Sequence, residues 1–174
     1  MTLERVGLLA GLGLLLLGCA GGQPSQSHGA TEPHEPTAID EVVTAYDEAR
    51  SQLANDQTDD LSAAFDRLQA AALAASEKDM PEVVTEHLTK VGVAAAKGAQ
   101  AEDGNLEEAR QAFGEASEHL VAAIASEPSL AHGLSIFECP MTKGYPKWVQ
   151  ASDSKANPYM GKEMQSCGVE SQWE

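Results

Sequence analysis

Basic residues are scarce in this chain of 174 residues, in which 11 Lys and Arg stand against 27 Asp and Glu and leave a formal net charge of −16. Binding to nucleic-acid phosphates requires a basic face, so this balance argues against a nucleic-acid partner. Only three Cys are present, which is too few for a small disulfide-rich scaffold. The apolar fraction of 43% is too high for a wholly disordered chain, and the length suits one domain.

Long hydrophobic runs are also missing, and we expect no bilayer-spanning segment in the mature protein. The apolar run at residues 6–17 has the length of a secretory signal core and is too short for a membrane helix. It ends in Leu16-Leu17-Gly18-Cys19, which resembles a bacterial lipobox. That resemblance implies a lipoprotein signal peptide at residues 1–18, cleavage after Gly18, and acyl chains such as palmitate on Cys19 that anchor the protein to a membrane.

The expected location is therefore extracytoplasmic. Because Ala20 rather than Asp follows Cys19, the lipobox favours the periplasm and the outer membrane in a double-membrane bacterium. The alternative is an ordinary signal peptide with an incidental Cys. Residues 19–37 then comprise the lipidated Cys19 and a flexible tether rich in Gly, Ser, Gln, Thr and Pro.

Residues 38–126 have helical periodicity almost throughout, and they predict an all-α fold with an up-and-down four-helix bundle and little or no sheet. Asn105 with Glu108 is expected to cap the fourth helix, and Pro128 to end the helical region. The four apolar stripes are Ile39, Val42, Val43, Tyr46, Ala49 and Leu53; Leu61, Ala64, Phe65, Leu68, Ala72 and Ala75; Val84, His87, Leu88, Val91 and Ala95; and Leu106, Ala109, Phe113, Ala116, Leu120 and Ile124.

Residues 127–174 form a short segment rich in Cys and Met, which we call the C-terminal hook. Residues 134–139 alternate and are expected to be extended, which would point Cys139 and Met141 to one side. Asn157-Pro158 is typical of a helix start, and a helix over residues 158–167 would place Met160, Met164 and Cys167 on one face.

The thiols of the two cysteines and the thioethers of two or three of the methionines in the hook would then lie close together. Soft sulfur ligands select soft cations, above all Cu(I), with Ag(I) as a close mimic. The alternative is a structural disulfide between Cys139 and Cys167, which an oxidising compartment permits and which would staple the hook without any metal. The two hypotheses are compatible if the disulfide forms reversibly and the two cysteines bind metal only when they are reduced.

The hook resembles the end of a bacterial family catalogued as domain of unknown function 3347, and the stretch from Val42 to Ile124 resembles that family's helices. The resemblance in the hook rests on Phe137-Glu138-Cys139-Pro140-Met141, Gly144, residues 148–150, residues 157–161, Met164 and Cys167-Gly168. Such domains occur as periplasmic lipoproteins and on membrane-fusion subunits of heavy-metal efflux pumps. The resemblance therefore implies copper or silver handling, with an efflux adaptor subunit as a partner.

Carried over residue by residue, the resemblance implies a ligand role for Cys139, Met141, Met164 and Cys167. Met160 stands where the family usually has an aromatic residue, and the segment between Met141 and Trp148 is shorter than usual. With this resemblance, metal binding takes precedence over a purely structural disulfide.

Two histidines are secondary metal candidates. His87 lies on the third apolar stripe and His119 lies beside Leu120 on the fourth. Histidines on helix faces are more often satisfied boundary residues, but either could complete a metal site if the hook folds over that end of the helices.

Motifs of hydrolytic or phosphate chemistry are absent: there is no Gly-x-Ser-x-Gly elbow, no His-Glu-x-x-His and no phosphate-binding Gly loop. We therefore expect a metal-binding protein and no enzyme. It would buffer the ion or pass it to an efflux system, and the alternative function is a non-metal interaction or scaffold module.

Overall fold

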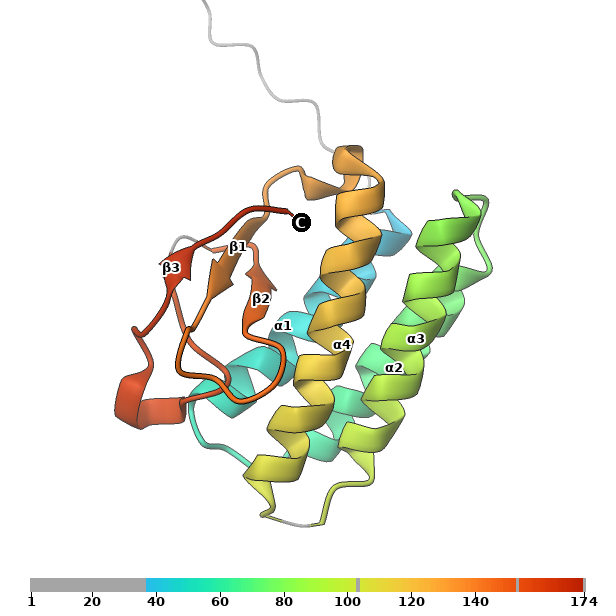
Figure 1. Ribbon diagram of the computed structural model, residues 1–174. Helices are drawn as coiled ribbons and strands as arrows, with labels where there is room; N and C mark the ends of the chain where they lie inside the picture. Colours follow the sequence, from blue (N-terminus) through green and yellow to red (C-terminus); the bar gives the residue numbers. More distant parts are fainter. Residues whose placement is uncertain (1–36, 103, 153, 174) are drawn as a thin grey trace, which may run out of the picture. The chain divides into compact units, whose positions relative to one another are not determined.

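The computed structural model describes residues 37–102, 104–152 and 154–173 (Figure 1). The expected signal peptide, the lipidation site at Cys19 and nearly all of the tether lie outside the described residues. None of the described helices is both long enough and apolar enough to cross a membrane.

The protein is mostly helical, and four helices occupy the predicted region: α1 (Ala38–Ala54), α2 (Leu61–Ser76), α3 (Glu82–Ala99) and α4 (Leu106–Ser126). Each packs against the next one along the chain, which is broadly compatible with the predicted bundle. The predicted apolar stripes are buried, except that His87 and Leu106 are half-buried. The α1–α4 contact is much smaller than the contacts between consecutive helices, so one side of the helical group is left for another element to cover.

The start of α1 and both ends of α4 follow local sequence signals, whereas α2 and α3 begin without a side-chain cap. Thr37 caps α1 through a capping box with Asp40, in which each side chain accepts a hydrogen bond from the other residue's backbone N–H. Asn105 caps α4 as expected, because its side-chain oxygen accepts a hydrogen bond from the Glu108 N–H at 3.2 Å. Pro128 begins the short 3-10 helix η1 (Pro128–Ala131), and α4 ends just before it.

The expectation of little or no sheet was wrong. Strands β1 (Ser135–Glu138), β2 (Lys147–Gln150) and β3 (Val169–Glu170) form a small antiparallel sheet in the order β2-β1-β3. The alternating segment before Cys139 is extended as predicted, but its strand partners were not foreseen. The sheet lies beside α1 and α4, away from α2 and α3 (Figure 1). Strand β2 contacts both α1 and α4, so it covers the side that these two helices leave open.

The helix expected over residues 158–167 was also wrong, because only the 3-10 helix η2 (Gly161–Met164) forms there. Asn157 closes a turn and caps no helix: its Oδ1 accepts hydrogen bonds from the Tyr159 and Met160 N–H groups, and η2 begins after Met160 without a side-chain cap. Gly161 has a φ of +59°, which interrupts a right-handed helix. A Cβ at this glycine would overlap the Asp56 carboxylate, so the close approach to α1 also requires glycine here.

A continuous series of aromatic contacts joins the helices to the sheet. Tyr46 on α1 contacts Phe113 on α4, with ring centroids 4.6 Å apart, and Phe113 meets Tyr159 at 6.1 Å. Tyr159 meets Trp148 on β2 edge to face at 6.0 Å, and Trp148 stacks on Phe137 of β1 at 5.6 Å. Trp148 is fully buried, so the sheet and the helices share one core.

Two arginines fix the chain around residues 156–158. Arg50 on α1 is almost fully buried and donates to the Ala156 carbonyl at 2.8 Å. Arg110 on α4 donates to the Pro158 carbonyl at 2.9 Å and pairs with Asp56 at 2.5 Å. Guanidinium groups suit this role because several donors project from one plane.

Truncation of Trp148 to Ala tests the shared core. It empties the space of a fully buried indole, and we expect a loss of about 3–5 kcal/mol in the free energy of unfolding. Urea unfolding followed by far-UV circular dichroism measures this loss. Val93→Ala is the control, since Val93 is 55% exposed and its truncation should change stability by less than about 0.5 kcal/mol. Equal effects of the two substitutions would contradict the shared core.

The contact between Asp56 and the hook predicts a dependence of stability on pH. The Lys162 N–H donates to Asp56 Oδ2 at 2.9 Å; this hydrogen bond, together with Arg110, outweighs burial and lowers the pKa of the Asp56 carboxyl. A carboxyl whose pKa is lower in the folded than in the unfolded chain stabilises the fold at any pH above its unfolded-state pKa of about 3.9. This stabilisation is lost as the pH falls through the folded-state pKa.

Asp56→Asn keeps an oxygen for the Lys162 N–H but removes the charge. We expect a loss of about 1 kcal/mol in the free energy of unfolding at pH 7. The difference from the wild type should shrink as the pH falls from about 4 to about 2. Urea unfolding at these pH values measures it, and Asp66→Asn at an exposed position of α2 is the control. A difference that does not depend on pH would refute the role assigned to the charge.

Candidate functional site

The hook brings its two cysteines together. Cys139 Sγ and Cys167 Sγ lie 3.4 Å apart, and no disulfide joins them. Cys139 is fully buried, whereas Cys167 is partly exposed. We call these two residues the thiol pair.

Cys139 is held where β1 ends and the chain turns. Its N–H donates to the Pro146 carbonyl at 3.0 Å, and its carbonyl accepts from the Thr142 N–H at 3.1 Å. The second bond closes a turn over residues 139–142, so the extended geometry expected to align Cys139 with Met141 ends at the cysteine. Met141 is therefore 59% exposed while Cys139 is buried.

Cys167 is held by a different set of bonds, after η2. Its N–H donates to the Met164 carbonyl at 2.9 Å, and its carbonyl accepts from Asn157 Nδ2 at 3.0 Å. Gly168 follows with a φ of +127°, and a Cβ there would lie 2.6 Å from the Trp148 ring. This close approach requires glycine, and it fixes the path of the chain beside Cys167.

The surroundings of the thiol pair favour one thiolate. Burial alone would raise the pKa of Cys139, but the Thr142 hydroxyl, the Met141 N–H, the Cys167 thiol and the Asn157 side chain together lower it. The Thr142 hydroxyl is buried and has no hydrogen-bond partner among the described residues, and its influence on the Cys139 pKa places it close to this sulfur. The hydrogen bond to Cys139 raises the pKa of Cys167, as do burial and the Cys139 charge. Cys139 therefore loses its proton before Cys167 does.

The thioethers are distributed unevenly around the pair. Met141 and Met160 line a hollow of about 530 Å³, which Thr142 also borders. Met164 is half-buried and does not line this hollow; its carbonyl bonds the Cys167 N–H. Since no α-helix forms over residues 158–167, Met160, Met164 and Cys167 do not share a helical face.

The thiol pair fits a soft metal ion after a small adjustment. With metal–sulfur bonds of about 2.3 Å, two sulfurs in a trigonal arrangement lie roughly 4 Å apart. Cys167 would therefore move outward by less than about 1 Å, and its partial exposure leaves room for this shift. The described residues contain no group of three or more His, Cys, Asp or Glu side chains that could hold an ion, so further ligands at the thiol pair would be thioethers.

The two candidate histidines meet each other and not the cysteines. The rings of His87 on α3 and His119 on α4 have centroids 5.7 Å apart. Burial lowers the pKa of His119, the main opposing influence being Glu118. Within the described part of the chain, no contact links either imidazole to the thiol pair, because the hook packs on the side of α1 and α4 away from α3.

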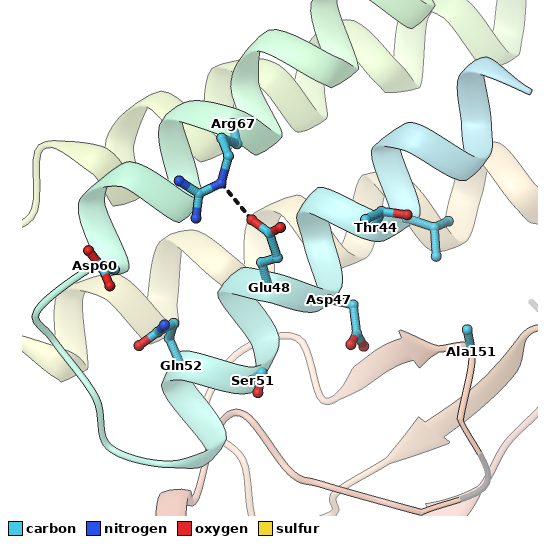
Figure 2. A pocket seen from close by; sticks show the side chains of 9 residues that line it. Thr44, Asp47, Glu48, Ser51, Gln52, Asp60, Arg67 and Ala151 are labelled. Carbon is cyan, nitrogen blue, oxygen red and sulfur yellow. Dashed lines mark hydrogen bonds and ion pairs between the residues drawn. The ribbon is translucent and has the colours of Figure 1, made fainter. Parts of the chain in front are cut away.

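A second hollow, of about 550 Å³, lies between α1, α2 and Ala151 (Figure 2). Its cation, Arg67, is neutralised by Glu48 at 2.5 Å. It is lined by neither sulfur nor imidazole, so its chemistry differs from that predicted for the hook.

Several residues around the thiol pair were not expected from the sequence. Asn157 and Thr142 act on the sulfurs, and Gly168 fixes the path of the chain beside Cys167. The Asn-Pro pair predicted a helix start, whereas Asn157 closes a turn and its amide donates to the Cys167 carbonyl.

No protein-family model, curated protein or solved structure matches the chain significantly. The resemblance to domain of unknown function 3347 therefore stays a prediction.

The thiol pair predicts rapid formation of an intramolecular disulfide on mild oxidation, because a small approach of the sulfurs completes the bond. For two Cys 28 positions apart, the chain-entropy relation gives a stabilisation of roughly 3–4 kcal/mol. Gly168→Ala should slow this oxidation several-fold, because the added methyl collides with Trp148 and displaces Cys167. Thiol titration over time measures the rate.

Gly104→Ala is the matched control for that substitution. Gly104 also has a positive φ, +82°, but a Cβ there meets nothing within 4 Å. It therefore imposes a similar backbone strain without the collision. Equal oxidation rates in the two variants, or oxidation that yields only intermolecular dimers, would count against the described position of Cys167.

Proposed function

We propose that this protein is a lipid-anchored extracytoplasmic protein that binds a soft metal ion, Cu(I) or its mimic Ag(I), through the thiol pair. The observation that carries the proposal is the 3.4 Å approach of two unbonded cysteine sulfurs, Cys139 and Cys167. Thiolate and thioether ligands select such ions over harder divalent cations.

Charge supports a monovalent ion at this position. Hydrogen-bond donors around Cys139 favour a single thiolate, and one thiolate neutralises one Cu(I). Thioethers then complete the coordination without adding charge to a buried site. Met141 is the nearest of them in the chain and its side chain is exposed, while Met160 and Met164 are the further candidates.

The anchor and the partner of the proposed function come from the sequence. The lipobox at residues 16–19 would acylate Cys19, and the tether would hold the helical domain away from the membrane. From this position the protein would buffer the ion or pass it to an adaptor subunit of a heavy-metal efflux pump. No catalytic step is assigned to it.

A competitive titration tests the metal site. Reduced full-length protein is titrated with Cu(I) against a chromophoric Cu(I) chelator, and we expect one tight equivalent. The variant with both Cys139→Ala and Cys167→Ala should bind more than about 100-fold more weakly, since removing even an outer partner of a ligand costs 10–100-fold. Ala fits the buried position of Cys139 without adding a polar group.

Methionine variants sharpen this titration. Met141→Leu should weaken binding by roughly tenfold, since it removes one thioether and keeps a similar volume. Met80→Leu is the matched control, because Met80 lies between α2 and α3, outside the hook. Unchanged affinity in the double cysteine variant would refute the proposal.

The approach of the two sulfurs equally favours a second function, a scaffold or interaction module stapled by a Cys139–Cys167 disulfide. Thiol counting separates the two. Exported protein that has no free thiol and takes up no Cu(I) after mild reduction would support the scaffold and contradict the metal site.

A further inference from the structure

Apart from the thiol pair, one further cluster of metal-ligating side chains lies across the contact of α3 and α4. His87 is near the start of α3 and His119 is near the end of α4, and these two antiparallel helices pack closely along their length. The two residues therefore face each other from separate elements whose positions the core fixes.

We propose that His87 and His119 form a second metal site, for a borderline divalent cation such as Cu(II) or Zn(II), which is independent of the thiol pair. Neutral imidazole is a common ligand of Zn, Cu and Ni ions. Among divalent ions the affinity of a nitrogen site rises to a maximum at Cu(II), so Cu(II) is the tightest expected occupant.

The spacing of the two rings agrees with a shared ion. Metal–nitrogen bonds of about 2.0–2.1 Å place the centroids of two imidazoles on one ion roughly 5–6 Å apart. The observed separation is 5.7 Å, and the planes are inclined by 36°. The two rings are therefore close enough to reach one ion from helices that keep their positions.

An unsatisfied nitrogen points to a missing ligand. His87 Nδ1 is buried and has no hydrogen-bond partner among the residues that the structure describes. Most buried polar atoms in folded proteins are paired, so such an atom calls for an explanation. A metal ion between the rings supplies the partner, and water would complete its coordination.

The charges around the rings are mixed, since carboxylates and the Lys90 ammonium both act on His119. Two of the nearby carboxylates already have partners, since Glu86 pairs with Lys90 at 2.7 Å and Glu115 with Lys97 at 2.5 Å. Glu118, which is exposed, adds negative charge beside His119. The net charge of −16 raises the local concentration of cations further.

The two sites have different neighbours. The thiol pair is surrounded by residues of the hook, whereas the charged groups that act on His119 are on α3 and α4. The proposed histidine site is therefore independent of the proposed Cu(I) site. It would hold Cu(II), the oxidised and harder form of the same metal.

The test uses full-length protein in a background with Cys139→Ala, Cys167→Ala, His28→Gln and His34→Gln, which removes the thiol pair and the tether histidines. Cu(II) is added and followed by electron paramagnetic resonance. We expect one equivalent with the hyperfine pattern of two nitrogen ligands. His87→Gln and His119→Gln should each weaken binding by roughly tenfold or more.

His132→Gln is the matched control, because His132 is exposed and lies outside α3 and α4. Zn(II) should raise the thermal unfolding midpoint of the background protein and of His132→Gln but not of His87→Gln. Circular dichroism without metal establishes that each variant folds. Absence of Cu(II) binding by the folded background protein, or binding that survives His87→Gln, would overturn the proposal.

Discussion

The structure depends on the insertion of a short strand beside two helices that barely touch each other. Strand β2 brings Trp148, Val149 and Gln150 fully into the interior, although a strand buried on both faces must satisfy its polar groups internally. Gln150 does so: its Oε1 accepts from the Trp148 indole N–H, and its Nε2 donates to the Ser152 and Ser154 carbonyls. Without this strand, the adjacent faces of α1 and α4 would be open to water, and β1 would lose its longer strand partner.

The helices could be predicted because their signals are local. A period of 3.6 residues, the cap at Asn105 and the stop at Pro128 all act within a few positions of the element they define. The proximity of Cys139 and Cys167 could also be predicted, because both cysteines lie in one short segment that folds back on itself.

The sheet and the fine geometry of the thiol pair could not be predicted, because their causes are distant in the chain. Lys147–Gln150 is only four residues long, and its strand character comes from pairing with β1 and packing on α4. The expected helix over residues 158–167 fails at Gly161, where the backbone must pass close to the Asp56 carboxylate of a segment more than a hundred positions away. The Cys-Pro-Met sequence turns and does not run straight, because the Thr142 N–H bonds back to Cys139.

The unequal exposure of the two thiols sets the order in which a reagent from solvent reaches them. An oxidant, a small thiol or an ion arriving from solvent can touch Cys167, whereas Cys139 lies behind it and out of reach. Any exchange must therefore proceed in sequence, with the outer sulfur engaged first and the inner, more acidic one closing the reaction. Departure from Cys139 would follow the same path in reverse, past Cys167.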